Sequence, residues 1–526
     1  MCGASAFSED GCNEADAQAR TGDLQGAISA DLSLWAPLWL EQANLDKVVT
    51  GGTGFMIGLL LFHTPPRKAQ PPTALYAADA MALRRRRPRL AESRVLAATV
   101  AAALAAVAVA FGAWAAIRPA NDSGRDLPIY EEDASIILDG NMPYRDLYIE
   151  YPPGALPMFV LPAVMFGDAR DAHWSPPNDA GRRYHRAFDS LVVLLTAAMV
   201  TFTALSLAAL RRPMRAQAIS LGVVASSPLL IGHVFVERYD VLPAALTAAA
   251  LAAAVRGHYR LGGAALGLGA AAKVYPALLL PVLVIVAARH RGIRESIMSA
   301  ASAVGAAVLV FLPFAIASWP ATWAMLRNQL GGGLQVETLM SSMLVMTRNV
   351  AEWVGLPTAE LTVRPEEHGL GRDVLHGAGI DATTTTLNVL LVIVLCLLWL
   401  ALARSKNDPR EDLVRYSALS VAAALVLGTV LSAQYITWLI PLIPLVAGRR
   451  GTAATLCFVA AAALTHAWFP SDAYGNYLRD FDPSATSLLL ARNLALLATA
   501  LVLAVPVRRL LPNGASSGRT PTPASA

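Results

Sequence analysis

Long uncharged apolar segments recur along the chain, and short polar segments separate them. The first long one runs from Ala97 to Ile117, where about 20 consecutive residues carry no charge. A helix of about that length spans the hydrocarbon core of a bilayer, which is roughly 30 Å thick. Because this pattern returns many times, it predicts an all-α membrane protein with many spans.

Composition supports the same class. Of the 526 residues, 55% are hydrophobic and 15% are charged, whereas soluble domains are about a quarter charged. This excludes an ordinary soluble protein, and we expect no nucleic-acid partner. The cysteines show no spacing typical of a metal site or a disulfide framework; they are Cys2, Cys12, Cys396 and Cys457.

The positions of Arg and Lys orient the predicted spans, because short basic loops stay in the cytoplasm. The cluster 84–89 contains five arginines and precedes the first span. When the chain is followed from there, every predicted return ends on Arg or Lys. This predicts about twelve helices with both termini in the cytoplasm. They are expected at about 95–117, 187–210, 216–235, 241–255, 261–272, 274–288, 297–317, 385–403, 414–431, 436–447, 452–468 and 487–507.

Three of these segments, 261–272, 274–288 and 436–447, are short for a complete span. We expect tilted, broken or half-inserted helices there. Residues 1–92 are mixed in polarity and predict a poorly ordered cytoplasmic segment. A membrane module is expected over 93–510, followed by a disordered cytoplasmic tail over 511–526.

The large loops, about 118–186 and 318–384, fall on the extracytoplasmic side of this topology. The segment 469–486 and the short turn 236–240 fall on the same side. Loops carry function when a rigid scaffold presents them. We therefore expect an active site that faces away from the cytoplasm.

The first of these loops contains a candidate catalytic carboxylate. Pro128 is typical of a helix start and Gly140 of a helix end, and apolar residues recur between them at helical spacing. Asp126 lies just before this helix, whose dipole favours an ionised carboxylate. A carboxylate at the membrane surface is a candidate general base. The alternative is that Asp126 only caps the helix.

Two charged groups lie at predicted membrane edges. Glu237-Arg238-Tyr239-Asp240 is denser in charge than anchoring at the interface requires. Lys273 faces outward in the predicted topology, against the positive-inside bias, and a cation there suits a lipid phosphate. The alternative for Lys273 is a lysine whose ammonium reaches up to the interface.

Two further segments carry weaker signals. Gln329 to Glu337 is rich in Gly and contains Gln335, and amide side chains suit a sugar. The segment Ser432 to Trp438 places polar groups at the same membrane face. Ordinary membrane-belt and packing roles explain these two segments equally well.

Taken together, these segments resemble the glycosyltransferase 87 family, known also as the DUF2029 group, from about residue 95 to 510. The order of the motifs carries the resemblance. The motifs are Asp126-x-x-x-Tyr130, Gly140-x-x-Pro143-Tyr144, Glu150-Tyr151-Pro152-Pro153-Gly154, Glu237-Arg238-Tyr239-Asp240-x-x-Pro243-Ala244, Lys273-x-Tyr275-Pro276, Gly333-x-Gln335-x-Glu337 and Gln434-Tyr435-x-x-Trp438.

The resemblance implies a GT-C fold, a polyprenyl-phosphate sugar donor and a catalytic Asp in the first outer loop, matched here by Asp126. The polyprenyl-phosphate-mannose-dependent branch has His where this chain has Gln434 and Tyr435. That departure leaves the donor sugar and the acceptor open. Substrate contacts are expected from Tyr130, Glu150, Tyr151, Glu237, Asp240, Tyr275, Gln335, Glu337, Gln434, Tyr435 and Trp438.

The expected function is sugar transfer, most simply of mannose, to an envelope glycolipid or glycan at the plasma membrane. Asp126 would take the acceptor proton, and Arg238 and Lys273 would bind the donor phosphate. In-line attack with one base predicts inversion, and we expect no metal and no cofactor. The alternatives are a GT-C arabinofuranosyltransferase, a transporter or flippase of lipid-linked glycans, and a non-catalytic glycan-binding scaffold.

Overall fold

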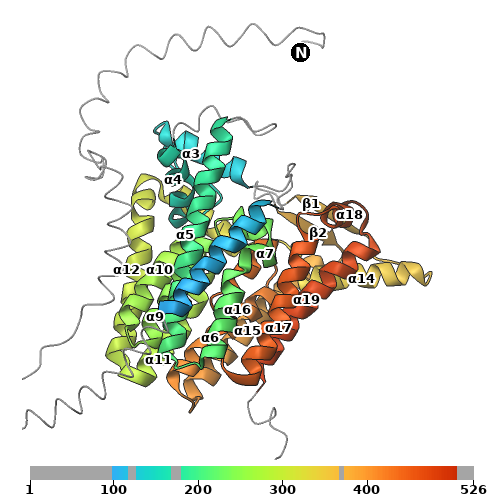
Figure 1. Cartoon of the computed structure of the whole chain (residues 1–526). Coiled ribbons are helices and arrows are strands. Elements are labelled where there is room, and N and C mark those ends of the chain that lie inside the picture. The colour runs from blue at the N-terminus through green and yellow to red at the C-terminus, as the bar shows by residue number, and fades with distance from the viewer. Residues whose placement is uncertain (1–96, 117–125, 167–178, 366–371, 506–526) are drawn as a thin grey trace, which may run out of the picture. The chain divides into compact units, whose positions relative to one another are not determined.

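The computed structural model describes residues 97–116, 126–166, 179–365 and 372–505, and these residues are mostly helical (Figure 1). They all belong to one compact unit. The predicted cytoplasmic segment 1–92 and the predicted tail 511–526 lie outside the described residues, as does the basic cluster 84–89.

Six of the described helices have the length and apolar composition of a complete membrane span. Each coincides with one of the predicted spans, although several begin a few residues earlier. The chain is therefore a multi-pass membrane protein. The helices are Ala97–Ala116, α5 (Asp179–Ala209), α12 (Ile293–Ala317), α15 (Ile380–Arg404), α17 (Gly448–Trp468) and α19 (Pro483–Ala504).

The other predicted spans are shorter or interrupted. Residues 216–235 form α6 (Met214–Ala225), α7 (Ser227–Ile231) and α8 (His233–Val236), with a break at Gly232, whose φ is +71°. The remainder form α9 (Val241–Val255), α10 (Tyr259–Ala272), η4 (Tyr275–Leu279), α11 (Leu280–Arg291), α16 (Pro409–Leu427), η5 (Ala433–Leu439) and η6 (Ile443–Leu445). The expected breaks in the short segments are present after α10 and within 436–447. The number of spans, about twelve, stays a prediction.

Ion pairs join the basic loops at one end of the helical bundle. Arg212, just after α5, pairs with Glu411 at the start of α16, with 2.6 Å between Nη1 and Oε1. Arg289, at the end of α11, pairs with Asp412 at 2.8 Å between Nη1 and Oδ2. Three of the loops that the sequence predicts to be cytoplasmic therefore meet at one end of the bundle.

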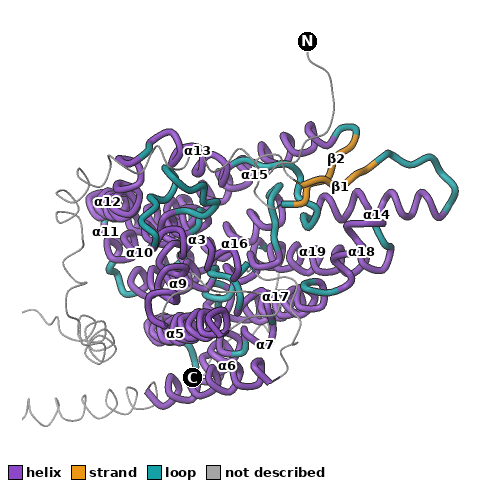
Figure 2. Tube along the Cα trace, turned by 90° about the horizontal axis from the view of Figure 1, so that it is seen from above, coloured by secondary structure: helices purple, strands orange, loops and turns teal. Residues whose placement is uncertain are grey.

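The remaining described elements come from the segments that the sequence predicts to be extracytoplasmic. They are α3 (Leu127–Leu138), η2 (Pro153–Ala155), α4 (Leu156–Phe166), α13 (Trp319–Leu330), α14 (Leu339–Trp353), α18 (Asp472–Asp480) and a β-hairpin. The hairpin pairs β1 (Leu361–Pro365) with β2 (Asp373–Gly377) in antiparallel register, and the all-α expectation did not include it. Figure 2 shows α14, α18 and the hairpin on one side of the bundle and α10 to α12 on the other.

Glycine allows a close contact between α10 and α12. A Cβ atom on Gly263 would lie 2.1 Å from the carbonyl oxygen of Ser299, and one on Gly267 would lie 2.0 Å from that of Ala303. Small residues four apart permit this kind of backbone approach in membrane helices. Gly154 permits a similarly close approach to the backbone of Ala271. This contact places the loop 150–154 against the end of α10 that precedes Lys273.

Gly267→Ala tests this contact. The added methyl group meets backbone rather than a movable side chain, so we expect a loss of about 1–3 kcal/mol of stability. Thermal unfolding in nanodiscs measures it. Gly305→Ala on α12 is the control, because a Cβ there meets nothing within 4 Å and alanine favours helix over glycine. Equal unfolding temperatures for the two variants would contradict the packing argument.

Candidate functional site

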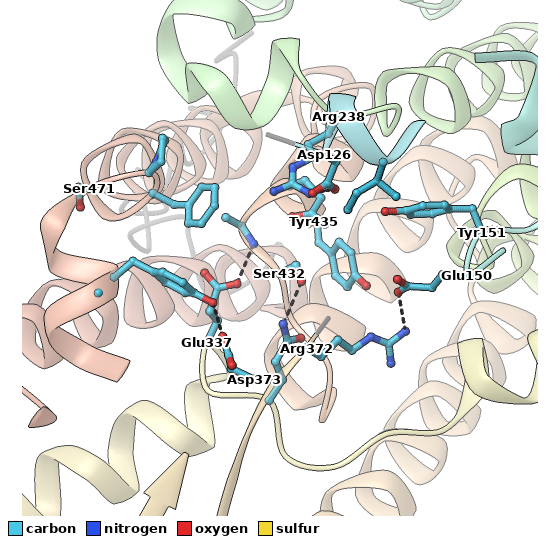
Figure 3. A pocket seen from close by; sticks show the side chains of 18 of the residues that line it. Asp126, Glu150, Tyr151, Arg238, Glu337, Arg372, Asp373, Ser432, Tyr435 and Ser471 are labelled. Atoms are coloured by element: carbon cyan, nitrogen blue, oxygen red, sulfur yellow. Dashed lines mark hydrogen bonds and ion pairs between the residues drawn. The ribbon is translucent and has the colours of Figure 1, made fainter. Parts of the chain in front are cut away.

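A cavity of about 640 Å³ opens among α3, the β-hairpin, α18 and the ends of several bundle helices (Figure 3). Asp126, at the start of α3, and Arg372 and Asp373 of the hairpin line it, so it lies at the end of the bundle that carries these elements. Nine of the predicted site residues line it. They are Asp126, Glu150, Tyr151, Arg238, Lys273, Gln335, Glu337, Gln434 and Tyr435.

Charged side chains of both signs line this cavity. The four cations are Arg238, Lys273, Arg372 and Arg479, and the five carboxylates are Asp126, Glu150, Glu337, Asp373 and Asp472. The near balance of charge favours a ligand that has both an anionic group and neutral polar groups. A ligand with many negative charges would meet repulsion from the carboxylates.

Asp126 and Arg238 form an ion pair at the cavity surface. Asp126 lies at the N-cap of α3, yet its side chain makes no capping hydrogen bond. Instead, its Oδ2 accepts a hydrogen bond from the Tyr130 hydroxyl at 3.3 Å. The capping alternative is therefore not what the structure shows. The carboxylate pairs instead with the guanidinium of Arg238, which lies 112 residues further along the chain.

Packed aromatic rings beneath this ion pair hold α3 in place. Tyr130 stacks on Phe159 with ring centroids 4.2 Å apart and an interplanar angle of 9°. Tyr239 meets Tyr130 edge-on at 6.0 Å. Both tyrosines are only 1% exposed, so Tyr130 supports the site from below and does not line the cavity.

Lys273 lies at the C-terminal end of α10 and is buried. Its ammonium is 3.4 Å from Asp240 Oδ1 and 4.6 Å from the Tyr239 ring centroid. Burial lowers the pKa of Lys273, but the charge of Asp240 raises it, and the balance lies above the ordinary value. Lys273 therefore stays charged at neutral pH, and its ammonium is paired rather than reaching out to the interface.

A stack of three rings extends below Lys273. Tyr435 lies over Trp438 with centroids 4.0 Å apart, and Tyr275 lies on Trp438 at 4.4 Å. The Trp438 indole N–H donates to Asp240 Oδ1 at 2.7 Å. Of the three rings, only Tyr435 lines the cavity. The other two fix its position and that of Asp240.

Gln335 and Glu337 hold the segment that carries Gln434 and Tyr435. Gln335 Oε1 accepts from the Leu431 amide at 2.9 Å, and its Nε2 donates to Ser432 Oγ at 3.0 Å. Glu337 Oε2 accepts from the Ala433 amide at 3.0 Å. Both side chains line the cavity, but the segment 431–433 uses much of their hydrogen-bonding capacity.

Glu337 is also half of a buried ion pair. Its Oε1 accepts from the Trp468 indole N–H at 2.6 Å and lies 3.7 Å from Arg492 Nη2. Burial raises the pKa of Glu337, although Arg492 opposes that shift. Glu337 therefore connects α17 and α19 to the cavity wall.

The hairpin supplies residues that the sequence analysis did not identify. Arg372 Nη2 is 3.8 Å from Glu150 Oε1, and its Nη1 donates to the Gly331 carbonyl at 3.4 Å. Asp373 Oδ2 accepts from the Tyr474 hydroxyl at 2.9 Å. The sequence signal for these two residues was weak, because it consisted of one adjacent Arg and Asp in the long loop 318–384.

Helix α18 supplies the other unexpected residues. Asp472, Tyr474 and Arg479 line the cavity from this helix, and Phe469 lines it from the segment just before. The sequence placed all four in an extracytoplasmic segment but gave them no role. Their approach to Asp126 depends on how α17 and α19 pack, which no local pattern encodes.

Five predicted contact residues do not line the cavity. They are Tyr130, Glu237, Asp240, Tyr275 and Trp438. Glu237 is 2% exposed and lies 3.6 Å from His233, between Oε1 and Nδ1. These five residues contribute to the layer below the surface, so a direct contact with substrate stays a prediction for them.

Comparison with protein families decides the class. The model of glycosyltransferase family 87 matches residues 148–433, which is more than half of the chain. The chain belongs to glycosyltransferase family 87. It is therefore a membrane glycosyltransferase, and the match includes Glu150, Arg238 and Lys273. Asp126 precedes the matched range, and Gln434 and Tyr435 follow it. No curated protein matches the chain.

Within the described ranges, no three His, Cys, Asp or Glu side chains are grouped so that they would hold a metal ion. The expectation of metal-independent transfer stays a prediction.

Glu337→Ala tests whether this residue holds the cavity wall. It leaves Arg492 buried without its partner carboxylate, and loss of one partner of a buried pair costs about 3–5 kcal/mol. We expect a clear drop in unfolding temperature in nanodiscs. The control is Glu352→Ala on α14, where the side chain is 55% exposed and the cost should be under about 1 kcal/mol. A wild-type unfolding temperature for Glu337→Ala would contradict the role.

Proposed function

We propose that this family 87 enzyme transfers a sugar, with mannose as the first candidate, from a polyprenyl-phosphate donor to an envelope glycolipid or glycan. The proposal places transfer on the extracytoplasmic side of the plasma membrane, with inversion at the anomeric carbon. The observation that carries it is the convergence of Asp126, Arg238 and Lys273 on one cavity.

The side of the membrane follows from charge. The loops after α5 and α11 carry Arg212 and Arg289 and are joined to the start of α16. Short basic loops stay in the cytoplasm. The cavity is lined by elements of the long predicted outer loops, so the proposal places it on the opposite side.

The donor class follows from the same placement. Nucleotide sugars are cytoplasmic, so an enzyme that works outside needs a donor that crosses the membrane attached to a lipid. A polyprenyl phosphate carries one anionic group on a long apolar chain. Arg238 and Lys273 lie at the ends of apolar helices, where a phosphate at the bilayer surface would meet both cations.

The chemical step needs one base and one leaving group. An acceptor hydroxyl oxygen attacks the anomeric carbon from the side opposite the phosphate, and its proton passes to the Asp126 carboxylate. The bond between the anomeric carbon and the phosphate oxygen breaks, and the electron pair leaves on the phosphate. Arg238 and Lys273 stabilise the charge that develops there. One in-line displacement inverts the configuration.

Because Asp126 is paired with Arg238, its strength as a base depends on whether the donor is bound. A guanidinium on the carboxylate weakens it as a base, because the charged form is already stabilised. When a donor phosphate binds Arg238, the guanidinium is shared with a second anion. The carboxylate then becomes a stronger proton acceptor, so the base is most effective when the donor is bound.

Asp126→Asn tests the base. Loss of a general base typically slows turnover by about 10²- to 10⁴-fold, and asparagine is also a good residue at a helix N-cap. The assay mixes purified protein in nanodiscs with synthetic polyprenyl-phosphate mannose and extracted envelope lipids. Asp139→Asn, at the exposed C-terminal end of the same helix, should keep wild-type turnover. Turnover by Asp126→Asn within a few-fold of wild type would refute the assignment.

Arg238→Gln tests the phosphate site. A hydrogen bond to a charged group contributes about 1.5–3 kcal/mol, so we expect polyprenyl phosphate to bind at least about tenfold more weakly. Titration in nanodiscs measures this without any transfer. Arg348→Gln, on α14 outside the cavity lining, is the control. Because Asp126 competes for the same guanidinium, Asp126→Asn should bind polyprenyl phosphate as tightly as wild type or more tightly.

The transfer assay also separates mannose transfer from the alternative, arabinofuranosyl transfer. Product with a polyprenyl-phosphate arabinose, and none with mannose, would keep the mechanism and change the sugar. Failure with every lipid-linked sugar, by protein that is shown to be folded, would refute the proposed donor.

A further inference from the structure

Two walls of the cavity are packed on different hydrophobic cores, and Phe469 packs against both cores. The first, here called the bundle wall, consists of Asp126, Tyr151, Arg238, Lys273 and Tyr435. Its base is the large core, which includes Tyr130, Tyr239 and Trp438. The second, here called the hairpin wall, consists of Asp373, Phe469, Asp472, Tyr474 and Arg479. Its base is a smaller core that includes Leu375, Trp468 and Tyr477.

The hairpin wall is organised around Tyr474. Its hydroxyl donates to Asp373 Oδ2 at 2.9 Å, which joins α18 to β2. Its ring meets Trp468 edge-on at 5.8 Å and Phe469 edge-on at 5.2 Å. Burial raises the pKa of Tyr474, so the hydroxyl stays protonated and remains a donor. The wall therefore presents carboxylates, one arginine and aromatic surface in a fixed arrangement.

Phe469 lies where the two walls meet. The Arg238 guanidinium is 5.9 Å from the centroid of its ring, and Tyr474 packs against the same ring. A ligand on the hairpin wall would thus lie beside the Asp126–Arg238 pair. In Figure 3, Ser471 and Tyr151 lie on opposite sides of the cavity, and Asp373 lies across it from Asp126 and Arg238.

We propose that the hairpin wall is the acceptor subsite and that it binds a neutral, hydroxyl-rich sugar unit of the acceptor. The inference rests on the proposed function and adds which wall receives which substrate. The phosphate of the donor needs the cations of the bundle wall. The hairpin wall has two carboxylates and one arginine, and the neighbouring Arg372 is paired with Glu150. The wall therefore disfavours a second phosphate.

The chemistry of the wall matches a sugar. Carboxylates accept hydrogen bonds from hydroxyl groups, and arginine donates to them. Phe469 offers apolar surface to the carbon–hydrogen face of a pyranose or furanose ring. A sugar bound here would present one free hydroxyl towards Asp126, and the position of Phe469 would set which hydroxyl that is. The choice of acceptor then depends on α18 and the hairpin, whereas the binding of the donor does not depend on them.

Asp472→Asn and Tyr474→Phe test the subsite. At saturating donor, each should raise the KM for the acceptor lipid that supports transfer by about tenfold, the effect of one lost hydrogen bond to a charged group. Affinity for polyprenyl phosphate should not change. Asp480→Asn is the matched control, because Asp480 lies on the same helix but does not line the cavity. Unfolding temperatures within a few degrees of wild type would exclude loss of the wall itself.

The outcomes separate this inference from the proposed function. An unchanged acceptor KM in both variants, or an equal change in the affinity for polyprenyl phosphate, overturns the acceptor subsite and leaves the transferase intact. A second measurement needs no transfer. Neutral mannose and arabinofuranose oligosaccharides are tested for binding by saturation-transfer NMR in nanodiscs. The subsite is supported if an oligosaccharide binds to the wild type and this binding is lost in both variants. It is overturned if no oligosaccharide binds to the wild type, or if binding to the wild type and both variants is equal.

Discussion

The site depends on the pairing of charges at the edge of an apolar bundle. Unpaired charges are costly to bury there, and each buried cation that the site uses has a carboxylate beside it. Lys273 lies against Asp240, and Arg492 lies against Glu337. Arg238 has Asp126. Aromatic rings pack against these pairs, such as Tyr239 against Lys273 and Phe469 against Arg238, and help to fix their positions.

Two of these pairs differ clearly in depth, and this difference gives them separate roles. Arg492 is 1% exposed, and the carboxylate beside it accepts from two N–H donors, so that pair supports the fold. The pair of Asp126 and Arg238 is more open, with side chains 18% and 13% exposed. Only a pair at the cavity surface can exchange one partner for a ligand. Under the proposed function, the chemistry is therefore concentrated where burial is least complete.

Much of the bundle wall could be predicted from the sequence, and the hairpin wall could not. Arg238 and Lys273 each stand next to an apolar segment, and a charge in that position is informative by itself. Asp126 stands just before a predicted helix, whose dipole favours its ionised carboxylate. Asp373 and Tyr474 lie in polar loops, where charged and aromatic residues are ordinary. They become a site only because β2 and α18 pack on one small core. The sequence also gave no means to separate cavity-lining residues such as Tyr435 from the supporting layer of Tyr275 and Trp438.

The sequence by itself determined the class of the protein, the six complete apolar helices, the ends of the bundle where basic residues lie and the helix that begins after Asp126. These properties depend on composition, length and spacing, which are local and directly readable. The tertiary structure alone decided that Asp126 meets Arg238 rather than capping its helix, that a hairpin forms, and that α18 lines the cavity. Each of these depends on contacts between segments far apart in the chain, and their geometry is set by how side chains fill the space between helices.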